Sequence, residues 1–182
     1  MLTTTYSLVT ISAEQKAVRT LLVRLRDYID SCIHGAREFD AGRIESALDK
    51  LLQFDRFCHA RKVEVVLIPS VLGIEGEIDD LVAQLDAISE RAMAALRAAE
   101  DRLQRSLGHG RERLADLVAA MRSYCDCQLS RLDREESELL PLLDRALPGD
   151  YWFSIATRLL SEDDVRLRRR ESAPPPRAPA FA

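Results

Sequence analysis

Apolar residues recur along most of the chain at steps of three and four, which is the spacing of one face of an α-helix. Four long runs of this kind predict helices over residues 12–33, 42–68, 75–107 and 111–140, and a shorter run predicts a fifth helix over 150–160. The first helix is expected to begin at Ser12, because Gln15 follows at the spacing of a capping box. Short connections that contain glycine or proline separate the runs. The pattern therefore predicts an all-α fold, an up-down-up-down four-helix bundle with a short fifth helix.

The composition agrees with one helical domain. The chain has 182 residues, of which 47% are hydrophobic and 31% charged, and it has only 7 glycines. This length suits a single domain with its own core. We expect the bundle to occupy residues 1–164, and residues 165–182, which are rich in arginine and proline, to form a disordered tail.

Charge and hydropathy limit the classes of partner. The formal net charge is −4, and residues 166–182 carry five arginines and one glutamate, so the preceding residues 1–165 carry −8. An acidic body gives no electrostatic attraction for nucleic acid or anionic lipid. No stretch reaches the roughly 18 apolar residues that span a bilayer. We expect a cytoplasmic protein without membrane contact, whose protein partner and oligomeric state the sequence does not identify.

The state of the four cysteines depends on the same expectation. In the reducing cytoplasm we expect free thiols at Cys32, Cys58, Cys125 and Cys127. Cys125 and Cys127 are two residues apart on a predicted helix, so their side chains diverge and do not form a metal-binding pair.

Two segments that end in proline resemble each other. One runs from His59 to Pro69 with Glu64 inside it, and the other runs from Arg131 to Pro141 and contains Glu135 and Glu136. Aligned on their prolines, both have aliphatic residues next to the proline and a glutamate five residues before it. A histidine and a carboxylate one helical turn apart lie on the same face and can bind metal in a bundle core. Glu135 fits the apolar stripe of its helix better than Glu136 does.

These segments resemble the hemerythrin-like family, also called HHE cation-binding domains, over residues 6–160. The resemblance includes Glu14-Gln15 with its following aliphatic repeat, Leu85 to Ala92, and the segment DYWFSIATRL. It implies a four-helix bundle that holds a non-haem di-iron centre with several histidines and bridging carboxylates.

The chain departs from this family at most ligand positions. It has three histidines, and we expect His34 and His109 to be exposed and without a role in a site. The substituted ligand positions are Gln15, Val63, Ser89 and Arg131, and the retained metal-ligand candidates are His59, Glu64, Glu135 and Glu136. Arginine has no lone pair to offer a cation, and its charge repels one. We expect Arg131 to pair with Glu64 or Glu135 instead.

Two functions remain as hypotheses. The first is a hemerythrin-like module that has lost most di-iron ligands, carries no cofactor, and serves in binding or regulation rather than oxygen transport. The alternative retains a mononuclear or weak cation site, for iron or another divalent ion, on His59, Glu64 and Glu135 with Gln15 or Cys58, and uses it in redox chemistry or sensing. The sequence has no nucleophile–base pair, phosphate-binding glycine loop or dinucleotide fingerprint that would indicate an enzyme.

Overall fold

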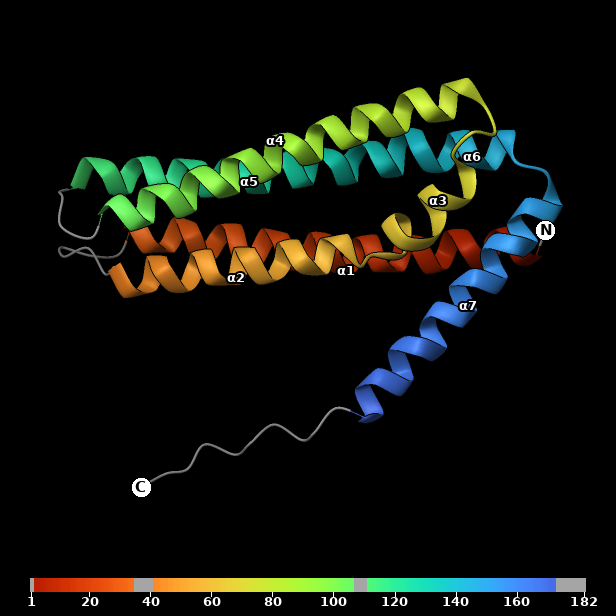
Figure 1. Ribbon diagram of the computed structural model, residues 1–182, viewed down its shortest axis with the longest axis horizontal. Helices are drawn as coiled ribbons and strands as arrows, with labels where there is room; N and C mark the ends of the chain where they lie inside the picture. The colour runs from red at the N-terminus through yellow and green to blue at the C-terminus, as the bar shows by residue number, and fades with distance from the viewer. Residues whose placement is uncertain (1, 35–40, 107–110, 173–182) are drawn as a thin grey trace.

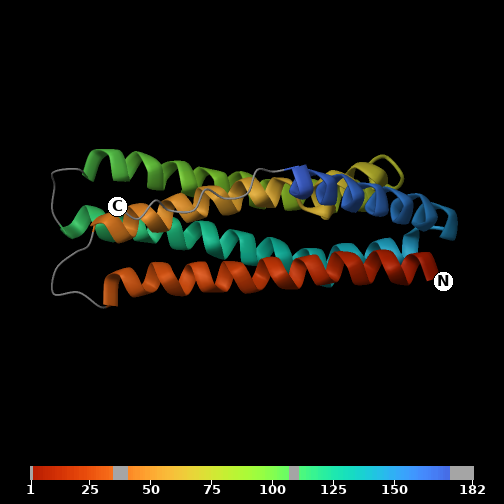
Figure 2. The same ribbon diagram turned by 90° about the horizontal axis from the view of Figure 1, so that it is seen from below.

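The computed structural model describes residues 2–34, 41–106 and 111–172. Within these ranges the chain is helical and contains no strand, which confirms the all-α prediction. Four long helical runs lie side by side (Figure 1), and they remain so when the molecule is turned (Figure 2).

The first helix begins earlier than predicted. α1 spans Leu2–His34, so the expected start at Ser12 is wrong. The added residues are rich in threonine, which is a poor helix former, but Ser7 and Ile11 are buried and α1 packs against the C-terminal helix. Tertiary packing therefore forms the first turns, which local sequence did not predict.

The second run is not one continuous helix. α2 (Ala41–His59) ends nine residues before the predicted end, and residues 60–61 form a break. A short π-helix, η1 (Val63–Leu67), and a single turn, α3 (Ile68–Val71), come next. The third run, α4 (Gly76–Ser106), agrees with its prediction.

The fourth run continues past its proline. α5 (Arg111–Arg134) leads into a second π-helix, η2 (Glu135–Leu139), and then into α6 (Leu140–Ala146). Pro141 lies in the first turn of α6, where the missing N–H costs least, so it does not end the helical run as expected.

The two glutamate–proline segments are thus alike in conformation. Each contains a π-helix of five residues that starts six residues before the proline. The N–H of Ile68 donates to the carbonyl of Val63, and the N–H of Leu140 donates to the carbonyl of Glu135. In an α-helix the ring of each proline would clash with the carbonyl four residues back. The wider π turn is consistent with relief of that clash, and π turns are frequent at functional sites.

The last helix is longer than predicted. α7 spans Gly149–Ser172, so residues 165–172, which were expected to begin a disordered tail, are helical. Residues 173–182 of that expected tail lie outside the described ranges. α7 starts beside the N-terminal end of α1 and runs at a slant away from the four long helices (Figure 1).

The apolar core is divided into two clusters. One is built on α2 and α5 with the C-terminal halves of α1 and α4, and contains Leu51 and Tyr124. The other is built on η1, η2, α6 and α7 with the N-terminal parts of α1 and α4, and contains Leu67 and Trp152. Buried charged and polar side chains lie between them.

Candidate functional site

The polar side chains between the two clusters come from every long helical run. Arg61, Glu64, Arg131 and Glu135 form a group of ion pairs, which we call the ion-pair network. Glu135 is 0% exposed, and Arg61 and Arg131 are each 2% exposed. Charges this deeply buried are tolerated only when they are paired and hydrogen-bonded.

Glu135 is the centre of the network. Its Oε1 accepts hydrogen bonds from Arg61 Nη2 at 2.7 Å and Arg131 Nε at 2.9 Å. Its Oε2 accepts from Arg61 Nη1 at 3.0 Å and from Gln15 Nε2 at 3.1 Å. Burial alone would raise the pKa of this carboxyl, but the charge of Arg61, its hydrogen bonds and the charge of Arg131 hold the pKa below its ordinary value. Glu135 is therefore ionised and its acceptor sites are occupied.

Glu64 closes the network on the solvent side. Its Oε1 accepts from Arg61 Nη2 at 2.9 Å and from Arg131 Nη2 at 2.8 Å, and its side chain is 24% exposed. Arg131 Nη1 donates to the carbonyl of Leu85 at 2.8 Å and to the hydroxyl of Ser89. The expected pairing of Arg131 is confirmed, and it reaches both glutamates.

Arg61 is the member that sequence reasoning missed. On a continuous helix it would lie about 200° from His59, so placing His59 inward put Arg61 on the solvent side. The break at residues 60–61 reverses the two. Arg61 enters the core, where burial alone would lower its pKa but Glu135 and Glu64 raise it. No signal in the sequence marks this break, because neither glycine nor proline lies there.

The other predicted site residues are spread over different environments. The inward position expected for His59 is wrong, because its side chain is 66% exposed and its Nε2 lies 3.5 Å from Asp55. Glu136 lies outside the core and pairs with Arg19 at 2.9 Å, which confirms the preference for Glu135 on the inner face. Val63 is buried in the second apolar cluster. His109 and the side chain of His34 lie outside the described part of the chain.

A small pocket opens beside the network. It holds about 120 Å³, and Arg61, Glu64, Arg131, Cys58 and Gln128 line part of it. Burial raises the pKa of the Cys58 thiol to about 12, so this cysteine is protonated near neutral pH and is a poor nucleophile. All four cysteines are free thiols, as predicted.

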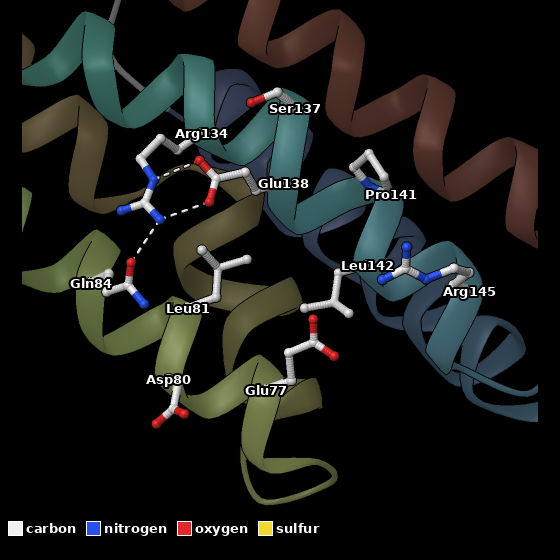
Figure 3. A pocket seen from close by; sticks show the side chains of 10 residues that line it. All are labelled: Glu77, Asp80, Leu81, Gln84, Arg134, Ser137, Glu138, Pro141, Leu142 and Arg145. Carbon is white, nitrogen blue, oxygen red and sulfur yellow. Dashed lines mark hydrogen bonds and ion pairs between the residues drawn. The ribbon is translucent and has the colours of Figure 1, made fainter.

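A larger groove of about 470 Å³ lies between α4 and the second π-helix. Figure 3 shows Arg134 reaching Glu138 on η2 and Gln84 on α4. Its Nε and Nη2 each lie 2.7 Å from one oxygen of Glu138. This hydrogen bonding raises the pKa of Arg134 and lowers that of Glu138. The pair is a solvent-exposed counterpart of the buried network on the same helical run.

The donor set does not fit a di-iron centre. Metals of this kind need imidazoles and unpaired carboxylates, whereas two guanidinium groups occupy the acceptor atoms of Glu135 and one oxygen of Glu64. Among the described residues, no three histidine, cysteine, aspartate or glutamate side chains are grouped as metal ligands would be. The same atoms cannot bind both arginines and a cation.

None of the described helices combines the length and the hydropathy needed to cross a bilayer. Comparisons with protein-family models, with curated proteins and with solved structures found no match.

Proposed function

We propose that the chain is a hemerythrin-like, up-down-up-down bundle in which a buried ion-pair network stands in place of a di-iron centre. It acts as a binding or regulatory module rather than as an oxygen carrier. The observation that carries this proposal is the placement of Arg61 and Arg131 on Glu135. Two positive charges hold the carboxylate that would otherwise bridge metal ions.

The matching π-helices support the family resemblance. The chain repeats one unusual conformation at the two glutamate–proline segments, at the same distance from each proline. These are the segments on which the resemblance rests. The short connections between successive long helices support the bundle topology.

Metal analysis tests the proposal. The protein is expressed in iron-rich medium, purified without chelator, and measured for metal content per chain and for the absorption band of an oxo-bridged di-iron centre. We expect neither stoichiometric metal nor the band, because a cation would have to displace both guanidinium groups. Two iron atoms per chain would refute the proposal.

The alternative cation site gives a different result in the same measurement. It predicts about one metal ion per chain, and its loss in His59→Ala. The exposed position of His59 disfavours this alternative, because the histidine lies outside the network that contains Glu135. A metal retained in His59→Ala would exclude this ligand set.

A further inference from the structure

The C-terminal helix α7 is held in two different ways along its length. Its first half is anchored by apolar side chains that are buried against the rest of the chain, Trp152, Ile155, Ala156 and Leu159. Beyond Leu159 its described side chains are exposed or partly buried, and this half contacts the α2–η1 break and α1 through hydrogen bonds and ion pairs. The second half therefore depends on charge rather than on apolar burial.

Those polar contacts converge on the break between α2 and η1. The N–H of Lys62 donates to Glu14 Oε2 at 2.7 Å, and the carbonyl of Ala60 accepts from Arg166. Arg166 Nη1 also donates to Glu14 Oε1 at 3.1 Å, and Lys62 Nζ donates to Asp163 at 3.0 Å. Breaking a helix frees backbone N–H and C=O groups that need new partners. Glu14 and Arg166 supply partners to the residues on both sides of Arg61.

We propose that Glu14, Lys62, Asp163 and Arg166 form a clamp through which the position of α7 controls the entry of Arg61 into the core. When the second half of α7 leaves, the backbone at residues 60 and 62 loses its partners, and Arg61 is no longer held in the ion-pair network. This goes beyond the proposed function, because it assigns the regulatory input to one helix.

The clamp is more open to solvent than the buried centre of the ion-pair network. Each ion pair of the clamp has one partly exposed partner: Arg166 is 29% exposed against 12% for Glu14, and Asp163 is 44% exposed against 11% for Lys62, whereas Glu135 is fully buried. Salt at about 1 M shortens the Debye length to about 3 Å and screens exposed pairs far more than buried ones. High salt should therefore open the clamp before it disturbs the network directly.

Hydrogen exchange at the break tests the clamp. Arg166→Ala and Glu14→Ala, the second of which removes the acceptor of the Lys62 N–H, are compared with Arg158→Ala, a matched control on the same helix that contacts Ser70 instead of the break. In the first two variants we expect exchange of the Lys62 amide to rise about five- to tenfold, as for loss of a helix-capping hydrogen bond. Wild-type protein in about 1 M salt should show the same local change.

A second readout detects Arg61 itself. The charge of Arg61 lowers the pKa of Glu135 more than any other group does. If Arg166→Ala releases Arg61, the pKa of Glu135 rises and this variant should unfold at a higher pH on acidification than Arg158→Ala does. The difference should vanish when both carry Glu135→Gln. Unchanged exchange at Lys62 would overturn the proposal, and so would an increase spread over the whole second cluster with altered Trp152 emission. Neither outcome depends on metal content, so this test and the test of the proposed function fail separately.

Discussion

Glu135 is a carboxylate whose environment is set almost entirely by arginine. Four donors surround it, and three of them come from two guanidinium groups. A buried ion pair of this kind adds little to the free energy of unfolding compared with apolar residues of the same volume. Removing one partner is costly, because an uncompensated charge remains in the core.

Arg131→Ala should therefore destabilise the protein by about 3–5 kcal/mol. Arg134→Ala is the matched control, since Arg134 lies three residues further along the same helical run and pairs with Glu138 at the surface. We expect a much smaller loss for that variant. Urea unfolding of the two variants measures the difference. Equal losses of stability in the two variants would show that the buried ion pair is no more important for folding than the exposed one.

Acid should act on the network through Glu135. Because its pKa in the folded chain is held below the ordinary value, the unfolded chain takes up this proton first as the pH falls. The stabilisation is complete above the unfolded pKa of about 4.3 and is lost as the pH falls through the lower folded pKa. The free energy of unfolding of wild type should fall more steeply below this value than that of Glu135→Gln. Parallel curves would contradict the assignment.

The inward position of Glu135 and the pairing of Arg131 could be predicted from the sequence, because both depend on one helical stripe and on opposite charge. Arg61 could not be predicted. Its place depends on a backbone break that is stabilised by Glu14 and Arg166, two residues far from it in sequence. Non-local capping of this kind leaves no periodic signal.

Among the elements, the π-helices decide which faces the last helical turns present to the core. A π turn contains one residue more than an α turn. In a regular α-helix that extra residue would rotate all later residues about the helix axis, and the wider turn absorbs it. Leu139, Leu142 and Leu143 are buried at and beyond the end of the second π-helix. The extra residue is thus part of the register that puts these leucines inside.

In a Pro141→Ala background, which removes the ring clash described above, deletion of Ser137 should convert η2 to an α-helix and leave those leucines facing the core. Deletion of Ser123, an equally exposed serine in the regular helix α5, should rotate every later residue by about 100° and expose buried leucines, each worth about 2–5 kcal/mol. We expect the Ser137 deletion to fold cooperatively and the Ser123 deletion to unfold at low urea. Circular dichroism during denaturation distinguishes them, and comparable collapse of both would refute the role assigned to the π turn.

The four long helical runs were predictable because each carries a long, strict apolar repeat. The predicted helix ends were wrong where tertiary packing, rather than local helix preference, determines where a helix begins or ends. The start of α1 depends on α7, and the length of α7 depends on its clamp to α1 and to the break before η1. A sequence window cannot contain both members of such a pair.

In the whole molecule, two apolar clusters are separated by a polar layer, and the single tryptophan, Trp152, lies in only one of them. Trp152 emission therefore reports the second cluster, while far-ultraviolet circular dichroism reports all helices. The network lies between both clusters and should make them unfold together.

We expect the two probes to give one transition in wild type. In Glu135→Ala the buried guanidinium charges no longer join the clusters, and the two transitions should separate. Glu138→Ala, on the same π-helix but at the surface, should behave as wild type. Coincident transitions in Glu135→Ala would show that the clusters cooperate without the network.

The polar layer also fixes the register of the long helices relative to one another. Apolar contacts between leucines are not directional, so a bundle with a purely apolar core tolerates a shift of one helix by a turn along its neighbours. Here a slip of one turn would carry Arg131 away from Glu64 and from the carbonyl of Leu85, and would leave its buried guanidinium without these partners. The buried charged layer therefore specifies the register of the helices. Only one alignment forms all of its hydrogen bonds, and alignments shifted by a turn, which apolar contacts alone would allow, leave them unmade.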